Sequence, residues 1–188
     1  EHGVSWPIAF KAFGDWKLPT EIYLEIPGII IFGLNEFSTR LPEALLGTLS
    51  IPVLFLVVRH MTQNTTLSLL SAVFFAISPW HVFMSRNAFG YNVLGLFFFL
   101  LGVYFFFNFV KGKRTHLLFA NCSFILTLFS YTAFHIVTPL FIGGLFLLYR
   151  KHFPFTRYIV GQIVLFGVFY VVASLSVLEA NAQKIAGT

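Results

Sequence analysis

Six apolar runs separated by short polar turns constrain this chain more than any other feature of its sequence. They lie at roughly residues 41–60, 65–80, 90–110, 116–132, 136–149 and 158–178. A helix needs about 20 apolar residues to cross a bilayer. Of the whole chain, 57% is hydrophobic and only 10% is charged, which is far from the balance of a soluble globular domain. The sequence therefore predicts an all-α membrane protein, a multi-span helical bundle with about six spans, two of them short.

The stretch from residue 13 to 42 comes before the first predicted span and carries much of the charge. Its apolar run, residues 22–34, has 13 residues and contains Glu25 and Pro27. This run is too short for a spanning helix and predicts an interfacial or re-entrant helix instead. We therefore divide the chain into residues 1–40, an extracytoplasmic loop with a juxtamembrane helix, and residues 41–188, part of a transmembrane bundle. Because the chain opens without Met and stops abruptly after a span, we interpret it as a fragment of a longer protein.

The charges alternate with the predicted loops, which indicates a topology. If residues 1–40 are outside the cytoplasm, the inner loops hold seven of the 12 Lys and Arg residues and no acid; these seven are Arg59, Lys111, Lys113, Arg114, Arg150, Lys151 and Arg157. All seven acids then lie on the outer side: Glu1, Asp15, Glu21, Glu25, Glu36, Glu43 and Glu179. This distribution follows the positive-inside rule. Topology thus accounts for the formal charge of +5, and no nucleic-acid partner is expected.

Several familiar kinds of site are excluded by the sequence. There is no phosphate-binding Gly-rich loop, no nucleophile elbow, no HExxH and no Gly-rich dinucleotide turn. The single cysteine, Cys122, cannot form a disulfide within the chain. No His or Cys pair has metal-ligand spacing, so no metal ligand is assigned from the sequence. The residues alone thus predict a membrane protein with a polar extracytoplasmic face.

The polar residues of that outer face each have a structural interpretation beside a functional one. Asp15 and Lys17 fit a solvated loop, and Arg86 fits a cation that reaches the interface along its aliphatic stem. His81 and His135 fit hydrogen-bonded interfacial residues better than metal ligands. The aromatic residues of the same loops, such as Trp80, Tyr91 and Tyr131, fit an interfacial belt.

Three blocks of the sequence carry a resemblance to a known family. The first is FGDWKLP at 13–19 with IYL at 22–24, FGLNEF at 32–37 and RLP at 40–42; the second is SPWH through SR at 78–86; the third is YT at 131–132 through PL at 139–140. They resemble the outer loops of large GT-C glycosyltransferases. The most similar groups are the prokaryotic relatives of the dolichyl-phosphate-mannose protein mannosyltransferases and the aminoarabinose transferases that modify lipid A. Leu18 departs from the family's K/H-P-P block, where a Pro is usual.

The resemblance implies an integral-membrane glycosyltransferase that moves a sugar, with inversion, from a polyprenyl phosphate to a hydroxyl group on a protein or lipid outside the cytoplasm. The enzyme would be a hexosyl- or pentosyltransferase of the cell membrane, surrounded by membrane lipids. The family's principal Asp-Glu pair is expected upstream of Glu1, so the fragment alone is expected to be inactive. The resemblance leaves a divalent metal ion open as a cofactor.

The resemblance also suggests roles for individual residues. Asp15 aligns with an acid just before the K/H-P-P block, so we expect it to act as the catalytic carboxylate or to position the acceptor or a metal ion. Inverting transfer needs such a general base and a partner for the departing phosphate. The substrate-binding candidates are the outer cations and two histidines of the matching loops, where relatives often carry an Arg near the position of His135: Lys17, Arg40, Arg86, His81 and His135.

Other functions stay open at this point. A transporter would place ionisable residues near the middle of its spans, and the sequence shows no charged residue deep in any predicted span. A non-catalytic membrane subunit would not need a polar outer face. An oligosaccharyltransferase-type enzyme is the alternative with the same fold.

Overall fold

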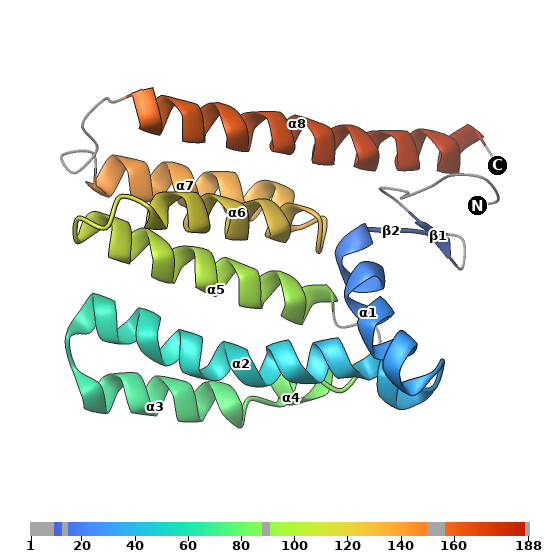
Figure 1. The fold of residues 1–188 in the computed structure, drawn as a ribbon, viewed down its shortest axis with the longest axis horizontal. Helices are drawn as coiled ribbons and strands as arrows, with labels where there is room; N and C mark the ends of the chain where they lie inside the picture. Colours follow the sequence, from blue (N-terminus) through green and yellow to red (C-terminus); the bar gives the residue numbers. More distant parts are fainter. Residues whose placement is uncertain (1–9, 13–14, 88–90, 150–156, 187–188) are drawn as a thin grey trace.

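The fold of the chain is a bundle of antiparallel helices with one short helix set across its end (Figure 1). The computed structural model describes residues 10–12, 15–87, 91–149 and 157–186. Its helices are α1 (Pro19–Phe32), α2 (Glu36–Thr62), α3 (Thr65–Ala76), α4 (Pro79–Met84), α5 (Tyr91–Val110), α6 (His116–Leu128), α7 (Phe134–Tyr149) and α8 (Arg157–Ala186). The predicted helical class is confirmed, and the predicted helix over residues 22–34 is present as α1.

A small β-hairpin departs from the all-α prediction. Within the described residues, strands β1 (Phe10–Ala12) and β2 (Asp15–Lys17) pair antiparallel, with Phe10 opposite Lys17. The hairpin lies beside α1 at one end of the bundle (Figure 1). Strands of three residues fall below the length at which alternation of apolar and polar residues can be recognised in a sequence.

Two of the predicted spans have the length and composition to cross a membrane. They are α2 and residues 92–110 of α5. The other apolar helical stretches of the described chain have 10–17 residues, fewer than the roughly 20 of a spanning helix. They are α3, α6, α7 and residues 159–175 of α8, which as a whole has 30 residues. The run predicted at 65–80 is divided at Ile77 and Ser78, because the residue before Pro79 disfavours the helical conformation. The first span begins earlier than predicted, at Glu36, so Arg40 lies on the helix.

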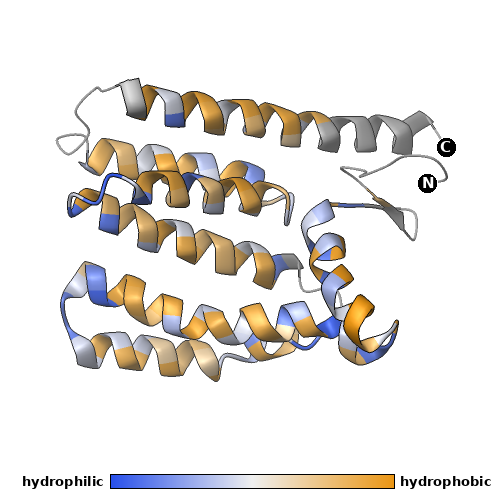
Figure 2. Ribbon diagram, in the orientation of Figure 1, coloured by the Kyte–Doolittle hydropathy of each residue, from blue (hydrophilic) through white to orange (hydrophobic). Residues whose placement is uncertain are grey.

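Helix α5 is at the centre of the bundle, between α2 and α6 (Figure 1). The buried core joins α2, α5, α6 and α7 through Val57, Val103, Phe106, Phe107, Ala120, Phe124 and Leu145. Apolar residues cover the lengths of the helices, and hydrophilic residues gather at the turns (Figure 2). Polar contacts also cross between helices: the Asn121 side-chain amide donates to Gln162 on α8, and the hydroxyls of Thr127 and Thr138 are 3.0 Å apart.

The helices change direction at each turn, so the turns gather at two ends of the bundle (Figure 1). The turns after α2 and α5 and the last turn of α7 lie at one end. Helix α1, the hairpin, α4 and the turn after α6 lie at the other end. The structure thus places on one end the segments that the charge pattern predicts to be extracytoplasmic.

Because α5 packs closely on α6, replacing a glycine by alanine should affect stability very differently at two positions. A Cβ at Gly102 would lie 2.7 Å from the ring of Phe124, which is buried in the core. Gly102→Ala should therefore lower the free energy of unfolding by about 1–3 kcal/mol. Gly144→Ala in α7 is the matched control, because its Cβ meets no atom within 4 Å. Unfolding in detergent would measure both, and equal stabilities of the two variants would contradict this packing.

Candidate active site

The turn between α1 and α2 is fixed by its own sequence. Gly33 has a φ of 76°, a conformation that side chains other than glycine rarely adopt, and it ends α1. Asn35 caps the start of α2: its side-chain oxygen accepts from the Ser38 amide at 2.9 Å, and the Ser38 hydroxyl accepts from the Asn35 amide at 3.1 Å. This reciprocal cap satisfies amides that would otherwise lack partners. The chain therefore folds back sharply, and α1 packs on the first turns of α2.

Gly28 allows α1 to lie close to α2. A Cβ on Gly28 would be 2.9 Å from the backbone carbonyl oxygen of Ser38 and 3.7 Å from the Leu41 side chain. Backbone atoms cannot move aside as a flexible side chain can, so a larger residue would push the two helices apart. At the N-terminal end of α1, the Thr20 amide lies 3.4 Å from the carbonyl oxygen of Phe129, at the turn after α6. Helix α1 is thus held at both α2 and α6.

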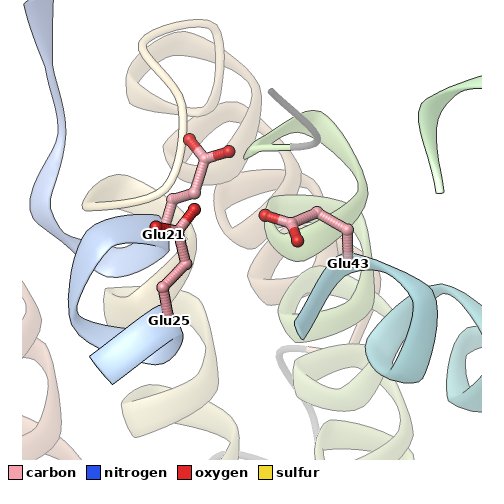
Figure 3. Close-up of side chains that lie close together, drawn as sticks. All are labelled: Glu21, Glu25 and Glu43. Atoms are coloured by element: carbon pink, nitrogen blue, oxygen red, sulfur yellow. The ribbon is translucent and has the colours of Figure 1, made fainter. Parts of the chain in front are cut away.

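This packing brings three carboxylates together. Glu21 and Glu25 are one turn apart on α1, and Glu43 faces them from α2 (Figure 3). Each offers a carboxylate oxygen, and these oxygens lie within 4.8 Å of one another. Glu43 is fully buried and Glu21 is 6% exposed, while Glu25 is half-buried. Neither oxygen of Glu43, nor Oε1 of Glu21, has a hydrogen-bond partner among the described residues.

The cluster raises the pKa of the two carboxyl groups on α1. Burial, together with the Glu43 carboxylate, raises the pKa of Glu21 to about 8, although Lys17 acts in the opposite direction. Burial raises the pKa of Glu25 to about 7, again with a contribution from Glu43. At an effective dielectric constant near 20, each pair of ionised carboxylates at this separation repels by roughly 3 kcal/mol. The cluster must therefore either hold protons or meet a cation.

A second feature of the same end is an open groove with two cations. Arg40 on α2 and Arg86 after α4 line a hollow of about 530 Å³, whose remaining lining is Ile77, Pro79, Val82, Phe83 and Asn87. The Arg40 guanidinium pairs with Glu36 at 2.6 Å, and both side chains are exposed. An exposed pair of this kind contributes about 0–1 kcal/mol, so Arg40 can exchange Glu36 for another anion.

Gly47 brings the two arginines to one groove. A Cβ on Gly47 would lie 2.7 Å from the Cβ of Ser85, the residue before Arg86. The absence of a side chain on α2 thus lets the segment after α4 lie against the helix that carries Arg40. Arg40 and Glu43 are three residues apart on α2, so the groove and the carboxylate cluster are neighbours along the same helix.

The remaining candidates from the sequence lie in different surroundings. His81 is buried and stacks on Phe75, with ring centroids 4.0 Å apart, and burial lowers its pKa. His135 is in the first turn of α7, and its Nδ1 lies 3.2 Å from the carbonyl oxygen of Thr132. Lys17 is half-buried at the end of β2, close enough to act on Glu21. Asp15 begins β2, but its side chain lies outside the described part of the structure.

The carboxylate cluster was not predicted from the sequence. The charge pattern treats Glu21 and Glu43 as outer-face acids, whereas the structure buries both side chains. Glu43 is buried by the packing of α1 on the first turns of α2. Two signals were available: Glu21 and Glu25 are spaced to share a helix face, and Glu43 is the acid inside an otherwise apolar run.

Comparison with known proteins gives one match. A family model described as dolichyl-phosphate-mannose-protein mannosyltransferase matches residues 23–177, which is most of the chain. The matched range includes Glu25, Glu43, Arg40 and Arg86. No curated protein and no solved structure matches the chain.

The raised pKa of Glu21 predicts how stability depends on pH. Between its ordinary value of 4.5 and about 8, the folded protein holds a proton that the unfolded chain releases, so stability falls as the pH rises through this range. Glu21→Gln removes this loss. With a chelator present, the variant should gain on the order of a few kcal/mol over the wild type between pH 5 and pH 9.

Unfolding of both proteins in detergent across this pH range would measure the effect. Glu36→Gln is the control for loss of one exposed carboxylate. Parallel pH profiles of the wild type and Glu21→Gln would contradict the burial of an interacting carboxyl group at position 21.

Proposed function

The chain belongs to the dolichyl-phosphate-mannose-protein mannosyltransferase family, a group of GT-C membrane glycosyltransferases, and we propose that it transfers a sugar from a polyprenyl phosphate to a hydroxyl group of a protein or lipid, with inversion. The reaction takes place at the end of the bundle that carries α1. That end faces away from the cytoplasm.

The groove between Arg40 and Arg86 is the observation that carries this proposal. A phosphate accepts charge-assisted hydrogen bonds from guanidinium groups, which suit its geometry better than an ammonium does. The apolar residues of the same groove, Ile77, Val82 and Phe83, provide a surface for the first part of a prenyl chain. Ile77 and Phe83 are 66% and 63% exposed, so they are open to lipid. One groove thus offers cations for the phosphate and an apolar surface for the prenyl chain of the donor.

The chemical step needs a base for the acceptor hydroxyl and a site for the departing phosphate. We assign the phosphate to Arg40 and Arg86, with Lys17 beside the neighbouring carboxylates. Asp15, two residues before Lys17 in β2, is the proposed carboxylate at the acceptor. His81 packs inside this end of the bundle, since it is buried, and His135 contacts the turn before α7 at its surface.

Replacing the groove arginines should weaken donor binding. Arg40→Ala or Arg86→Ala removes a charge-assisted contact, which is typically about 1.5–3 kcal/mol, or roughly ten- to hundredfold in affinity. Binding of a polyprenyl-phosphate sugar to the purified protein in nanodiscs would measure this. Arg59→Ala is the control, because Arg59 lies near the other end of α2. If all three variants bind the donor like the wild type, the groove is not the donor site.

The orientation of the bundle can be tested separately. Cys122 is first replaced by Ser, and a single Cys is placed at Leu34, in the exposed turn after α1, or at Lys113, in the exposed turn after α5. A membrane-impermeant thiol reagent added to intact cells should label position 34 and leave position 113 unlabelled. Labelling of position 113 alone would reverse the proposed orientation.

A further inference from the structure

We propose that Glu21, Glu25 and Glu43 bind a divalent metal ion that prefers oxygen ligands, such as Mg²⁺ or Mn²⁺. This site is distinct from the arginine groove, and its assignment does not depend on the transferase proposal.

The geometry of the cluster is that of a ligand set. The three side chains come from two helices and point toward one another (Figure 3), with one oxygen of each within 4.8 Å of the others. A cation at the centre of such a group can contact all three after small rotations of the side chains. Carboxylate oxygens are the donors that Mg²⁺, Mn²⁺ and Ca²⁺ prefer, and Mg²⁺ usually keeps several waters besides its carboxylates.

The unpaired buried oxygens provide the second argument. A buried polar atom is almost always hydrogen-bonded, and an ionised group more strictly so. Glu43 is fully buried, yet neither of its oxygens has a partner within the described part of the chain, and Oε1 of Glu21 is in the same situation. These two side chains are aimed at the space that a cation would occupy. A metal ion would give these oxygens a partner and would also neutralise the repulsion between the carboxylates.

The ligand types narrow the choice of metal. The described group contains no His and no Cys beside the three carboxylates. Zinc sites are built mostly from His nitrogen and Cys sulfur, whereas an oxygen-only set favours the hard cations. Mn²⁺ is therefore a suitable probe, and Mg²⁺ should compete with it.

A bound ion would also connect the two helices that form this end of the bundle. Glu21 and Glu25 belong to α1 and Glu43 to α2, so their shared ligand would tie α1 across the bundle end beside Arg40. Gly28 sets the distance between the same helices, because its Cβ position is 2.9 Å from the Ser38 carbonyl. We infer that metal affinity depends on Gly28 although its backbone offers no ligand.

Electron paramagnetic resonance of Mn²⁺, titrated into the purified protein in a neutral maltoside detergent, tests the proposal. Free Mn²⁺ gives a sharp signal that is lost on binding. We expect about one Mn²⁺ per chain, displaced by Mg²⁺. Glu43→Gln and Glu21→Gln should each weaken binding about tenfold or more, because the charge of the ligand set governs affinity in carboxylate sites. Glu36→Gln, which removes an exposed carboxylate outside the cluster, should bind like the wild type.

A second measurement separates loss of the site from loss of the fold. In chelator, the Gln variants should unfold at the same or a higher temperature than the wild type, since they relieve charge repulsion. Added Mn²⁺ should then raise the unfolding temperature of the wild type and of Glu36→Gln, but not that of Glu43→Gln. Gly28→Ala should bind Mn²⁺ more weakly although it keeps every ligand. Absence of stoichiometric binding by the wild type, or equal affinity of Glu43→Gln, would overturn the proposal.

Discussion

The close approach of α1 to α2 is the constraint on which this end of the molecule depends. Gly33 and the Asn35–Ser38 cap reverse the chain, and Gly28 lets the two helix backbones come together. Without that approach α1 would be an interfacial helix with solvated acids on one face. With it, Glu21 and Glu43 lose water and face each other. The raised pKa values on α1 follow from this packing, because burial is their largest cause.

Two kinds of charge are therefore arranged next to each other on α2. Glu43 faces inward to α1, and Arg40, less than one turn before it, faces the groove shared with Arg86. A glycine on the same helix, Gly47, admits the segment that carries Arg86. This arrangement suits the proposed donor, which carries a phosphate on an apolar chain. In that proposal the phosphate displaces the exposed carboxylate of Glu36 from Arg40.

The features that the sequence predicts well are those that depend on one segment at a time. Apolar runs identify helices, the 13-residue run with Pro27 predicts the short helix α1, and the motif blocks predict the family that the comparison confirms. Features that depend on contacts between segments were missed. Glu43 is an ordinary interfacial acid by sequence, and only the packing of α1 shows that it is buried against two others. Helix α3 is shorter than the run predicted at 65–80 because Pro79 interrupts that run.

The central claim is that α1 folds across the bundle end to build an oxygen-lined metal site beside the arginine groove. Anomalous X-ray scattering from crystals of the protein grown with Mn²⁺ tests it most directly, because it locates the ion and the side chains in one experiment. This account predicts an anomalous peak between the carboxylates of Glu21, Glu25 and Glu43, with α1 packed on α2 through Gly28. Carboxylates that lie apart in solvent, with no peak between them, would contradict it.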